Sequence, residues 1–190
     1  MAIFKVVNEV YKSEEDLKRL ISYVYSKALY WKSYNTITNK MDLIEKQFLY
    51  IQKCYGGELR TRALHYVLSF DNRGWEHWMK LKKINQCTFL YALYERFKNY
   101  QFFAAVHNHD THMHIHFIIN PVNRETLKVW HCSESEWNRM MQDMAYELFV
   151  HHKLALQSIS YIDENGKLQL GNQISPFLYM NRDYSYDKLK

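Results

Sequence analysis

The sequence predicts an α+β fold, in which a central antiparallel β-sheet of about five strands is covered by helices on one face. Segments that alternate between apolar and polar residues, as half-buried strands do, are interleaved with segments of helical periodicity. The later strands are joined by short connections, which are typical of antiparallel pairing. The chain has 190 residues, only two prolines and five glycines, and no stretch that resembles a linker or a repeat. We therefore expect one domain across residues 1–190.

The first elements are predicted to be a strand and a helix. Residues 2–8 have the pattern of a short strand. Ser13 precedes three acidic residues, as an N-cap does, and opens a helix that we expect to reach about Leu29. The apolar stripe of this helix consists of Leu17, Leu20, Ile21, Val24 and Ala28.

A second helix, a strand and a third helix follow. The second helix is expected from about Met41 to Cys54, and it ends at Gly56-Gly57. Residues 63–70 alternate as a strand, residues 71–74 form a turn, and residues 76–98 are expected to be helical.

The second half of the chain is predicted to contain mainly strands and one long helix. Strands are expected at residues 100–106 and 127–130, on either side of the histidine-rich strand described below. A Ser-x-x-Glu capping box at Ser133 opens a helix with methionine and aromatic residues at core positions. Residues 158–170 resemble a hairpin that turns at Glu-Asn-Gly, whereas the tail after Ser175 has no clear pattern.

Composition narrows the class of protein. The formal net charge is +5, and there are sixteen tyrosines. Aromatic and basic side chains can stack on bases and bind phosphates, so a nucleic-acid partner is permitted but not required. The three cysteines are widely spaced, and the N-terminus lacks the pattern of a signal peptide. We therefore expect a cytoplasmic protein without disulfides, without a cysteine zinc site and without membrane insertion.

Residues 107–116 are rich in histidine, and this segment is the strongest indication of function in the sequence. In the strand expected from His112 to Asn120, positions 112, 114 and 116 are histidine, whereas the positions between them are apolar. Successive side chains of a strand point to opposite faces, so the imidazoles would line one face. Two of them, with a third from the preceding loop, would form a three-nitrogen site for a divalent metal.

The stretch 106–123, with His-x-His-Asp at 107–110 and His-Ile-His at 114–116, resembles the third motif of the relaxases. These are the mobilisation and conjugation nucleases of the HUH endonuclease superfamily, named for two histidines that flank a hydrophobic residue. Residues 65–70 are similar to the family's second motif, a strand that ends in Ser-Phe. Residues 21–24 are similar to the first motif, which holds the nucleophilic tyrosine. The three motifs occur in the family's order.

The resemblance implies a metal-dependent single-strand DNA endonuclease that nicks at an origin of transfer. His107, His114 and His116 would hold the ion, with Mn²⁺ or Mg²⁺ expected and Zn²⁺, Ni²⁺ or Co²⁺ left open. A tyrosine oxygen would attack a phosphodiester and leave a 5′-phosphotyrosine and a free 3′-hydroxyl. Single-stranded DNA of the transfer origin, accessory mobilisation proteins and a secretion coupling protein are the implied partners. Relaxases are commonly longer, which leaves open that the chain is the N-terminal part of a longer protein.

One position departs from the family's pattern. Relaxases usually carry His-x-Asp, whereas the residue two positions after His107 is His109, and Asp110 follows it. We expect Asp110 to take over the acidic role, and the role of His109 stays open.

Three tyrosines near the first motif are candidates for the nucleophile. At about 100° per residue, Tyr25 falls about 80° from the centre of the apolar stripe, at the edge of the buried face. Tyr23 falls at about 240°, away from the stripe, where packing into the core does not explain the presence of a tyrosine. Position and resemblance together favour Tyr23 as the catalytic residue, followed by Tyr25 and then Tyr30.

Further polar residues near the motifs are predicted to contact DNA. Ser69, at the end of its strand, could donate to a phosphate. His112 shares the face of the histidine strand and is interpreted as a DNA contact or a partner of a metal ligand. Asn120 is assigned to the same DNA-contacting group.

Three other functions fit parts of the sequence. A rolling-circle replication initiator would carry Tyr-x-x-Lys on the helix after the histidines, whereas that helix has Tyr146 followed by Glu-Leu-Phe. A small three-histidine zinc hydrolase would cleave without a covalent adduct. A DNA-binding module with a structural metal would use four protein ligands.

Overall fold

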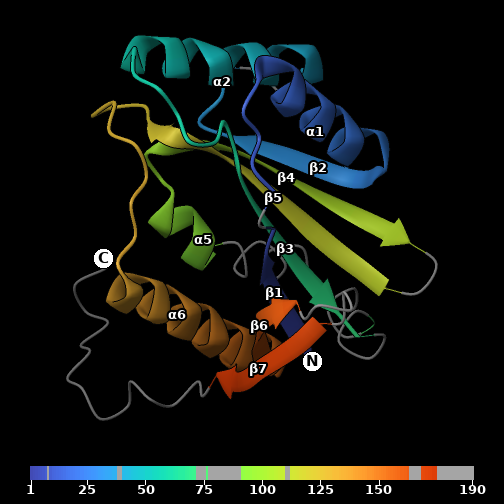
Figure 1. Cartoon of the computed structure of the whole chain (residues 1–190). Helices are drawn as coiled ribbons and strands as arrows, with labels where there is room; N and C mark the ends of the chain where they lie inside the picture. The colour runs from blue at the N-terminus through green and yellow to red at the C-terminus, as the bar shows by residue number, and fades with distance from the viewer. Residues whose placement is uncertain are drawn as a thin grey trace.

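A seven-stranded β-sheet forms the centre of the computed structural model, which describes residues 1–7, 9–37, 40–71, 76, 91–109, 112–162 and 168–174. Its strands lie in the order β2-β4-β5-β3-β1-β6-β7 (Figure 1). They are β1 (Ala2–Val6), β2 (Ala28–Tyr34), β3 (Leu64–Phe70), β4 (Tyr100–His109), β5 (His112–Asn123), β6 (Leu156–Ile162) and β7 (Leu168–Ile174). All neighbours are antiparallel except β1 and β6, which run parallel. The α+β class with a mainly antiparallel sheet is confirmed, and the sheet is wider than the five strands expected.

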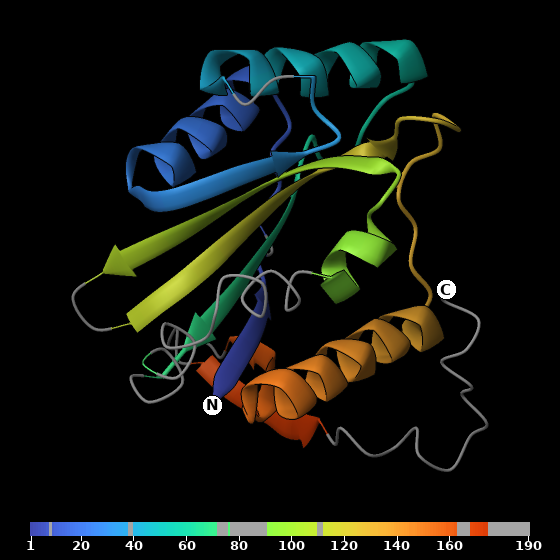
Figure 2. The same ribbon diagram turned by 180° about the vertical axis from the view of Figure 1, so that it is seen from behind.

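Helices cover both faces of the sheet rather than one. The labelled helices are α1 (Glu14–Ser26), α2 (Met41–Tyr55), α5 (Tyr91–Arg96) and α6 (Glu134–His152). Figures 1 and 2 show α1 and α2 on one face and α5 and α6 on the other. The prediction of a single covered face was wrong because the central strands are apolar on both sides. On β4, for example, Phe102 is buried towards α5 and α6, and its neighbour Phe103 is buried towards α1 and α2.

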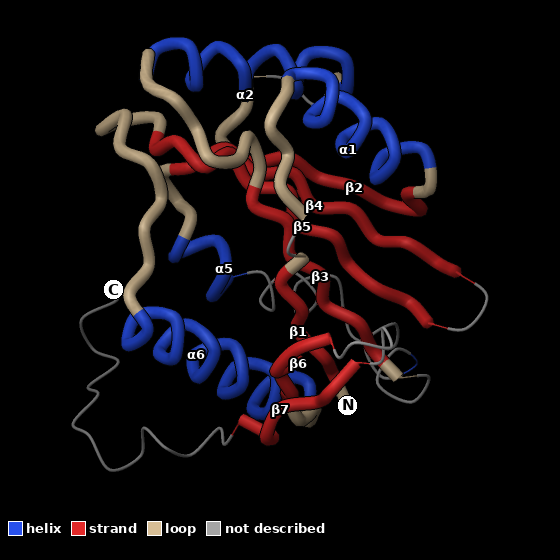
Figure 3. Tube along the Cα trace, viewed as in Figure 1, coloured by secondary structure: helices blue, strands red, loops and turns tan. Residues whose placement is uncertain are grey.

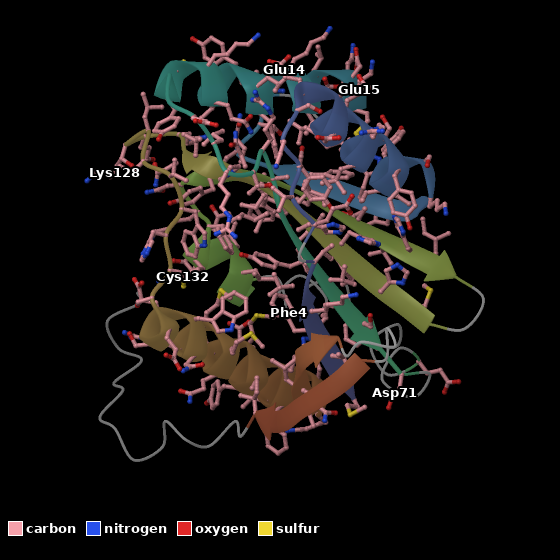
Figure 4. All side chains as sticks on the ribbon, viewed as in Figure 1. Phe4, Glu14, Glu15, Asp71, Lys128 and Cys132 are labelled. Atoms are coloured by element: carbon pink, nitrogen blue, oxygen red, sulfur yellow. The ribbon has the colours of Figure 1, made fainter. Side chains whose placement is uncertain are left out.

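The two faces bury separate groups of apolar side chains. The larger group joins β1, β3, β4 and β5 to α5 and α6 through residues such as Phe4, Tyr66, Phe117 and Met144. Figure 4 shows Phe4 between the sheet and α6. The smaller group joins α1 and α2 to the other face, where Phe103 and residues of both helices meet. The sheet is therefore the middle layer of three.

Helix α1 begins as predicted but ends earlier. Ser13 accepts a hydrogen bond from the Asp16 main chain, and the Asp16 side chain accepts one from the Ser13 main chain, which completes a capping box. The helix ends at Ser26, three residues before Leu29, and after Lys27 the chain enters β2. Strand β2 was not predicted, because its apolar residues continue the helical stripe in the sequence.

Helix α2 and strand β3 follow the predicted pattern closely. α2 ends at Tyr55, and Gly56 adopts the left-handed conformation (φ 71°) that glycine accommodates without strain. In β3, Leu64, Tyr66, Leu68 and Phe70 face α5 and α6, whereas His65, Val67 and Ser69 lie on the opposite face, on which α1 and α2 pack. The β3 side chains therefore supply polar groups to the face on which α1 lies.

Other predicted segments are placed in part. Of the helix expected at 76–98, residue 76 and α5 are helical, residues 97 and 98 form a turn, and residues 77–90 lie outside the described residues. Of the turn expected at 71–74, only residue 71 is described. The strand expected at 127–130 is reduced to a single bridge between Val122 and Val129. The hairpin is present as β6 and β7, but its turn at 163–167 and the tail from 175 lie outside the described residues. None of the described helices is long and apolar enough to cross a membrane.

Candidate metal centre

The antiparallel pairing of β4 and β5 brings three histidines together on the face covered by α1. His107 of β4 lies opposite His114 of β5 in the register, and His116 lies opposite Ala105. Their ring centroids are 5.3 Å (His107–His114), 4.4 Å (His107–His116) and 4.8 Å (His114–His116) apart. One ring nitrogen from each lies within 4.8 Å of the others. The predicted ligand set therefore converges, with His107 contributed by a strand and not by the expected loop.

This arrangement is suited to one divalent cation. His107 and His116 are buried, whereas His114 is partly exposed, so the triad is open to solvent on the side of His114. Three imidazoles leave coordination positions for water or a substrate oxygen, as in catalytic rather than structural sites. The neutral imidazole is a good ligand for Mn²⁺, Co²⁺, Ni²⁺ and Zn²⁺.

His107 is oriented by the end of α1. Its Nε2 lies 2.6 Å from the carbonyl oxygen of Val24. A carbonyl only accepts, so Nε2 donates the proton, and Nδ1 of the neutral ring keeps its lone pair for a metal. Val24 lies in the last turn of α1, where carbonyls have no partner within the helix. The negative end of the helix dipole therefore lies against the centre and favours a cation there.

His116 is oriented by a different group. Its Nδ1 lies 2.8 Å from Nε2 of His65 on β3, and Nδ1 of His65 lies 2.8 Å from the Tyr11 hydroxyl. Burial, with a smaller effect of the positive charge of Lys5, lowers the pKa of His65 to about 4, so this ring is neutral at neutral pH. Burial likewise raises the pKa of Tyr11.

Tyr23 is the candidate nucleophile that contacts the triad. Its ring centroid is 6.1 Å from that of His107 and 6.2 Å from that of His116, edge-on to both. The side chain is 45% exposed, which leaves room for a substrate. Tyr23 belongs to helix α1, which lies over β2 and β4 (Figure 3). The amine of Lys27 lies 4.8 Å from the centre of the same ring.

The other two candidate tyrosines lie elsewhere. Tyr25 packs edge-on against Trp31, with ring centroids 5.6 Å apart. Tyr30 lies on β2, the strand at the edge of the sheet, and is largely exposed. Tyr146, which the alternative of a replication initiator would need, is on α6, across the sheet from the histidines.

For Ser69, His112 and Asp110, the structure gives only part of the environment of the side chain, or none of it. Ser69 lies opposite His114 in the β3–β5 register and is partly buried. The backbone of His112 begins β5, opposite His109. Asp110 lies outside the described residues. Its expected acidic role is therefore still a prediction.

Asn120 does not have the position expected of a DNA contact. Its side chain is fully buried under α2, where Nδ2 donates to the carbonyl of Phe48 and to the side chain of Gln101. Its Oδ1 accepts from the Gln52 side chain and from the main chain of Val122. The face of β5 that carries His114 and His116 continues through Ile118 into the core beneath α2, so Asn120 serves the fold there.

His65 and Tyr11 are the site residues that sequence reasoning missed. His65 is part of the second motif and lies on the same strand face as Ser69, which was the available signal. Tyr11 carries no such signal, because it lies in the connection before α1 and reaches His65 across 54 positions of sequence.

Comparisons with known proteins agree with this geometry. Residues 23–154 match the family of relaxases described as MobA/VirD2-like, nuclease domain. Among solved structures, the chain resembles the MobM relaxase domain (MOBV; Mob_Pre), solved bound to 26-nucleotide pMV158 oriT DNA. The match has a TM-score of 0.51 and 17% sequence identity, and it covers 80% of this chain and 86% of that chain, which supports a common fold. No curated protein matches the sequence significantly.

Proposed function

The chain belongs to the MobA/VirD2-like relaxase nuclease domains, and we propose that it nicks single-stranded DNA at an origin of transfer with Tyr23 as the nucleophile. One observation carries the choice of residue. The Tyr23 ring lies against two of the three converging histidines, whereas Tyr25 packs against Trp31. The MobM domain with a related fold was solved with oriT DNA, which supports the same class of substrate.

His107, His114 and His116 would hold the metal. Nδ1 of His107 would be its ligand atom, since Nε2 donates to Val24. A bound divalent ion would act as a Lewis acid towards the scissile phosphate. The all-imidazole set is better suited to Mn²⁺, Co²⁺, Ni²⁺ or Zn²⁺ than to Mg²⁺, and the abundance of Mn²⁺ and Mg²⁺ in the cell would make one of these two the bound ion.

Tyr23 would carry out a transesterification. Its oxygen forms a bond to phosphorus while the bond from phosphorus to the 3′-oxygen breaks. The proton lost by the phenol balances the proton taken up by the 3′-oxygen, so the products are a 5′-phosphotyrosine and a 3′-hydroxyl. The phosphodiester energy is retained in the adduct, and the strand can later be rejoined.

Several broader assignments accompany this proposal. The seven-stranded sheet across the described residues supports one nicking domain. Membership in the relaxase family supports accessory mobilisation proteins and a secretion coupling protein as partners. The widely spaced cysteines support a cytoplasmic location.

A covalent trapping experiment tests the proposal. The protein, Mn²⁺ and a labelled single-stranded origin oligonucleotide should form an adduct that survives denaturation and carries the fragment 3′ of the nick. Tyr23→Phe removes one hydroxyl and should abolish the adduct while DNA binding persists, and Tyr25→Phe is the matched control that should retain it. Cleavage without an adduct in the unmodified protein would identify water as the nucleophile and favour a three-histidine hydrolase.

A further inference from the structure

A chain of hydrogen bonds extends from His116 away from the proposed metal position. His116 Nδ1 and His65 Nε2 are 2.8 Å apart, and His65 Nδ1 and the Tyr11 hydroxyl are also 2.8 Å apart. The Tyr11 hydroxyl in turn donates to the carboxylate of Glu9 across 3.3 Å. The participating residues come from β5, from β3 and from the connection before α1. Three segments that are distant in sequence therefore meet behind one ligand.

We propose that His65 and Tyr11 are positioning residues, which hold His116 in the one tautomer that can bind a metal and thereby set the affinity of the centre. The inference rests on the proposed function, because it takes His116 as a ligand. It extends that function by assigning roles to two residues that lie behind His116 and are not part of the triad.

The Glu9 carboxylate determines the direction of the whole chain. A carboxylate only accepts, so the single hydroxyl proton of Tyr11 is used towards Glu9, and the Tyr11 oxygen accepts from His65 Nδ1. His65 is buried between two polar partners, and burial disfavours a charged imidazole, so the ring carries a single N–H. This N–H is on Nδ1, and Nε2 therefore accepts from His116 Nδ1. His116 Nε2 then carries a lone pair on the side of the triad. If Tyr11 instead donated to His65, every bond in the chain would reverse. His116 would then carry its proton on Nε2, which could no longer bind the ion.

Because these three side chains are buried, the direction of the hydrogen bonds between them affects which tautomer of His116 is stable. Tyr11, His65 and His116 are 4%, 7% and 6% exposed, so water is largely excluded from the contacts between them. Buried polar groups that lose a partner cost free energy, and the two tautomers therefore differ in energy. Partners of this kind behind a metal-bound histidine typically change metal affinity by about 10- to 100-fold when removed.

A structural explanation competes with the positioning role. The same bonds could only satisfy buried polar groups, as the Gln52–Asn120–Gln101 group does under α2. That explanation predicts a loss of stability on mutation and no specific effect on the metal or on the His116 ring. Gln101→Leu is therefore a suitable control, because Gln101 is buried on the same face of the sheet and bonds to Asn120 rather than to the triad.

The test combines Mn²⁺ titration by calorimetry, without DNA, with ¹⁵N NMR of the metal-free protein labelled at histidine. His65→Leu removes the acceptor of His116 Nδ1 and should weaken Mn²⁺ binding about 10- to 100-fold. The His116 signal should change from the Nδ1–H form to a mixture. Tyr11→Phe should have a smaller effect in the same direction and keeps the test available if His65→Leu does not fold. His65→Gln, whose amide oxygen can accept from Nδ1, should restore part of the affinity, and Gln101→Leu should leave affinity and tautomer unchanged.

The possible outcomes separate this inference from the nicking proposal. Unchanged Mn²⁺ affinity and tautomer in His65→Leu, or in Tyr11→Phe where His65→Leu does not fold, would overturn the positioning role even if the DNA adduct forms. Failure of the unmodified protein to bind Mn²⁺ would overturn it as well. Tight Mn²⁺ binding that weakens in the variants, combined with no DNA adduct in the unmodified protein, would support the positioning role and reject the nicking proposal alone.

Discussion

His107 donates a hydrogen bond through Nε2 to the carbonyl oxygen of Val24, 2.6 Å away, and so joins the strand that supplies a metal ligand to the helix that supplies the nucleophile. Val24 is the next residue after Tyr23 in α1. One contact therefore orients the ligand ring and holds the end of the helix. Movement of either partner would disturb both.

The contact predicts different effects for two ligand mutations. His107→Ala and His114→Ala should both abolish the thermal stabilisation by Mn²⁺, which at about 100 times the Kd amounts to about 2.7 kcal/mol, or about 5–11 °C in Tm. His107→Ala should also destabilise the metal-free protein, by about 1 kcal/mol or more, because it removes a buried bond to Val24. This loss should exceed that in His114→Ala, whose ring is partly exposed. Thermal and urea unfolding with and without Mn²⁺ measure both effects. Equal stability of the two metal-free variants would contradict a role of His107 in holding α1.

Lys27 is predicted to attract the DNA backbone at the nucleophile. Its amine lies over the Tyr23 ring, at the edge of the triad. Lys27→Gln should weaken binding of single-stranded DNA and reduce the slope of log K against log salt by about 0.7 if one phosphate contact is lost. Lys53→Gln is the matched control, because Lys53 pairs with Glu14 at the opposite end of α1. Binding isotherms at several salt concentrations measure the slopes, and equal slopes for the two variants would argue against a contact at Lys27.

Asn120 is predicted to affect stability rather than DNA binding. Asn120→Leu leaves the side chains of Gln52 and Gln101 and the carbonyl of Phe48 with fewer partners in a buried place. We expect a loss of about 1–3 kcal/mol in the free energy of unfolding. Urea denaturation measures the loss, and DNA affinity at a fixed salt concentration should match that of the unmodified protein. A weaker affinity with unchanged stability would restore the original expectation of a DNA contact.

The two capping boxes predict a dependence of stability on acid. The hydrogen bond from the Ser13 main chain lowers the pKa of Asp16 from 3.8 to about 2, and the bond from the Ser133 main chain lowers that of Glu136 from 4.5 to about 2. Because the folded values are lower than the unfolded ones, the ionised carboxylates stabilise the fold above the unfolded values, and this contribution is lost as the pH falls towards about 2. The double variant Asp16→Asn, Glu136→Gln should lose less stability between about pH 5 and about pH 3 than the unmodified protein. Urea unfolding at both pH values checks this, and equal losses would contradict it.

Local patterns in the sequence were sufficient for the elements whose signals are themselves local. The capping boxes at Ser13 and Ser133 mark the starts of α1 and α6 because their hydrogen bonds span three residues. The alternation of β5 placed His114 and His116 on one face, and short-range pairing with β4 brought His107 to them.

Features that depend on distant contacts were missed. The end of α1 is set by the pairing of β2 with β4, which a helical stripe cannot show. His65 meets His116 across 51 positions, and only the register of β3 on β5 brings them together. Asn120 was assigned to DNA because alternation identifies a face of a strand but not the point at which a helix covers it.

The junction between α1 and β2 has a consequence for how this domain can vary. Lys27 alone separates Ser26 from Ala28, and Ala28 is paired with His107 on the neighbouring strand. This one-residue connection therefore fixes the position of Tyr23 relative to the sheet. An added residue would turn the phenol by about 100° around the helix axis if the helix lengthened to absorb it. Length changes that are harmless in most surface connections would here separate metal binding from strand cleavage, and this junction should tolerate substitutions but not insertions.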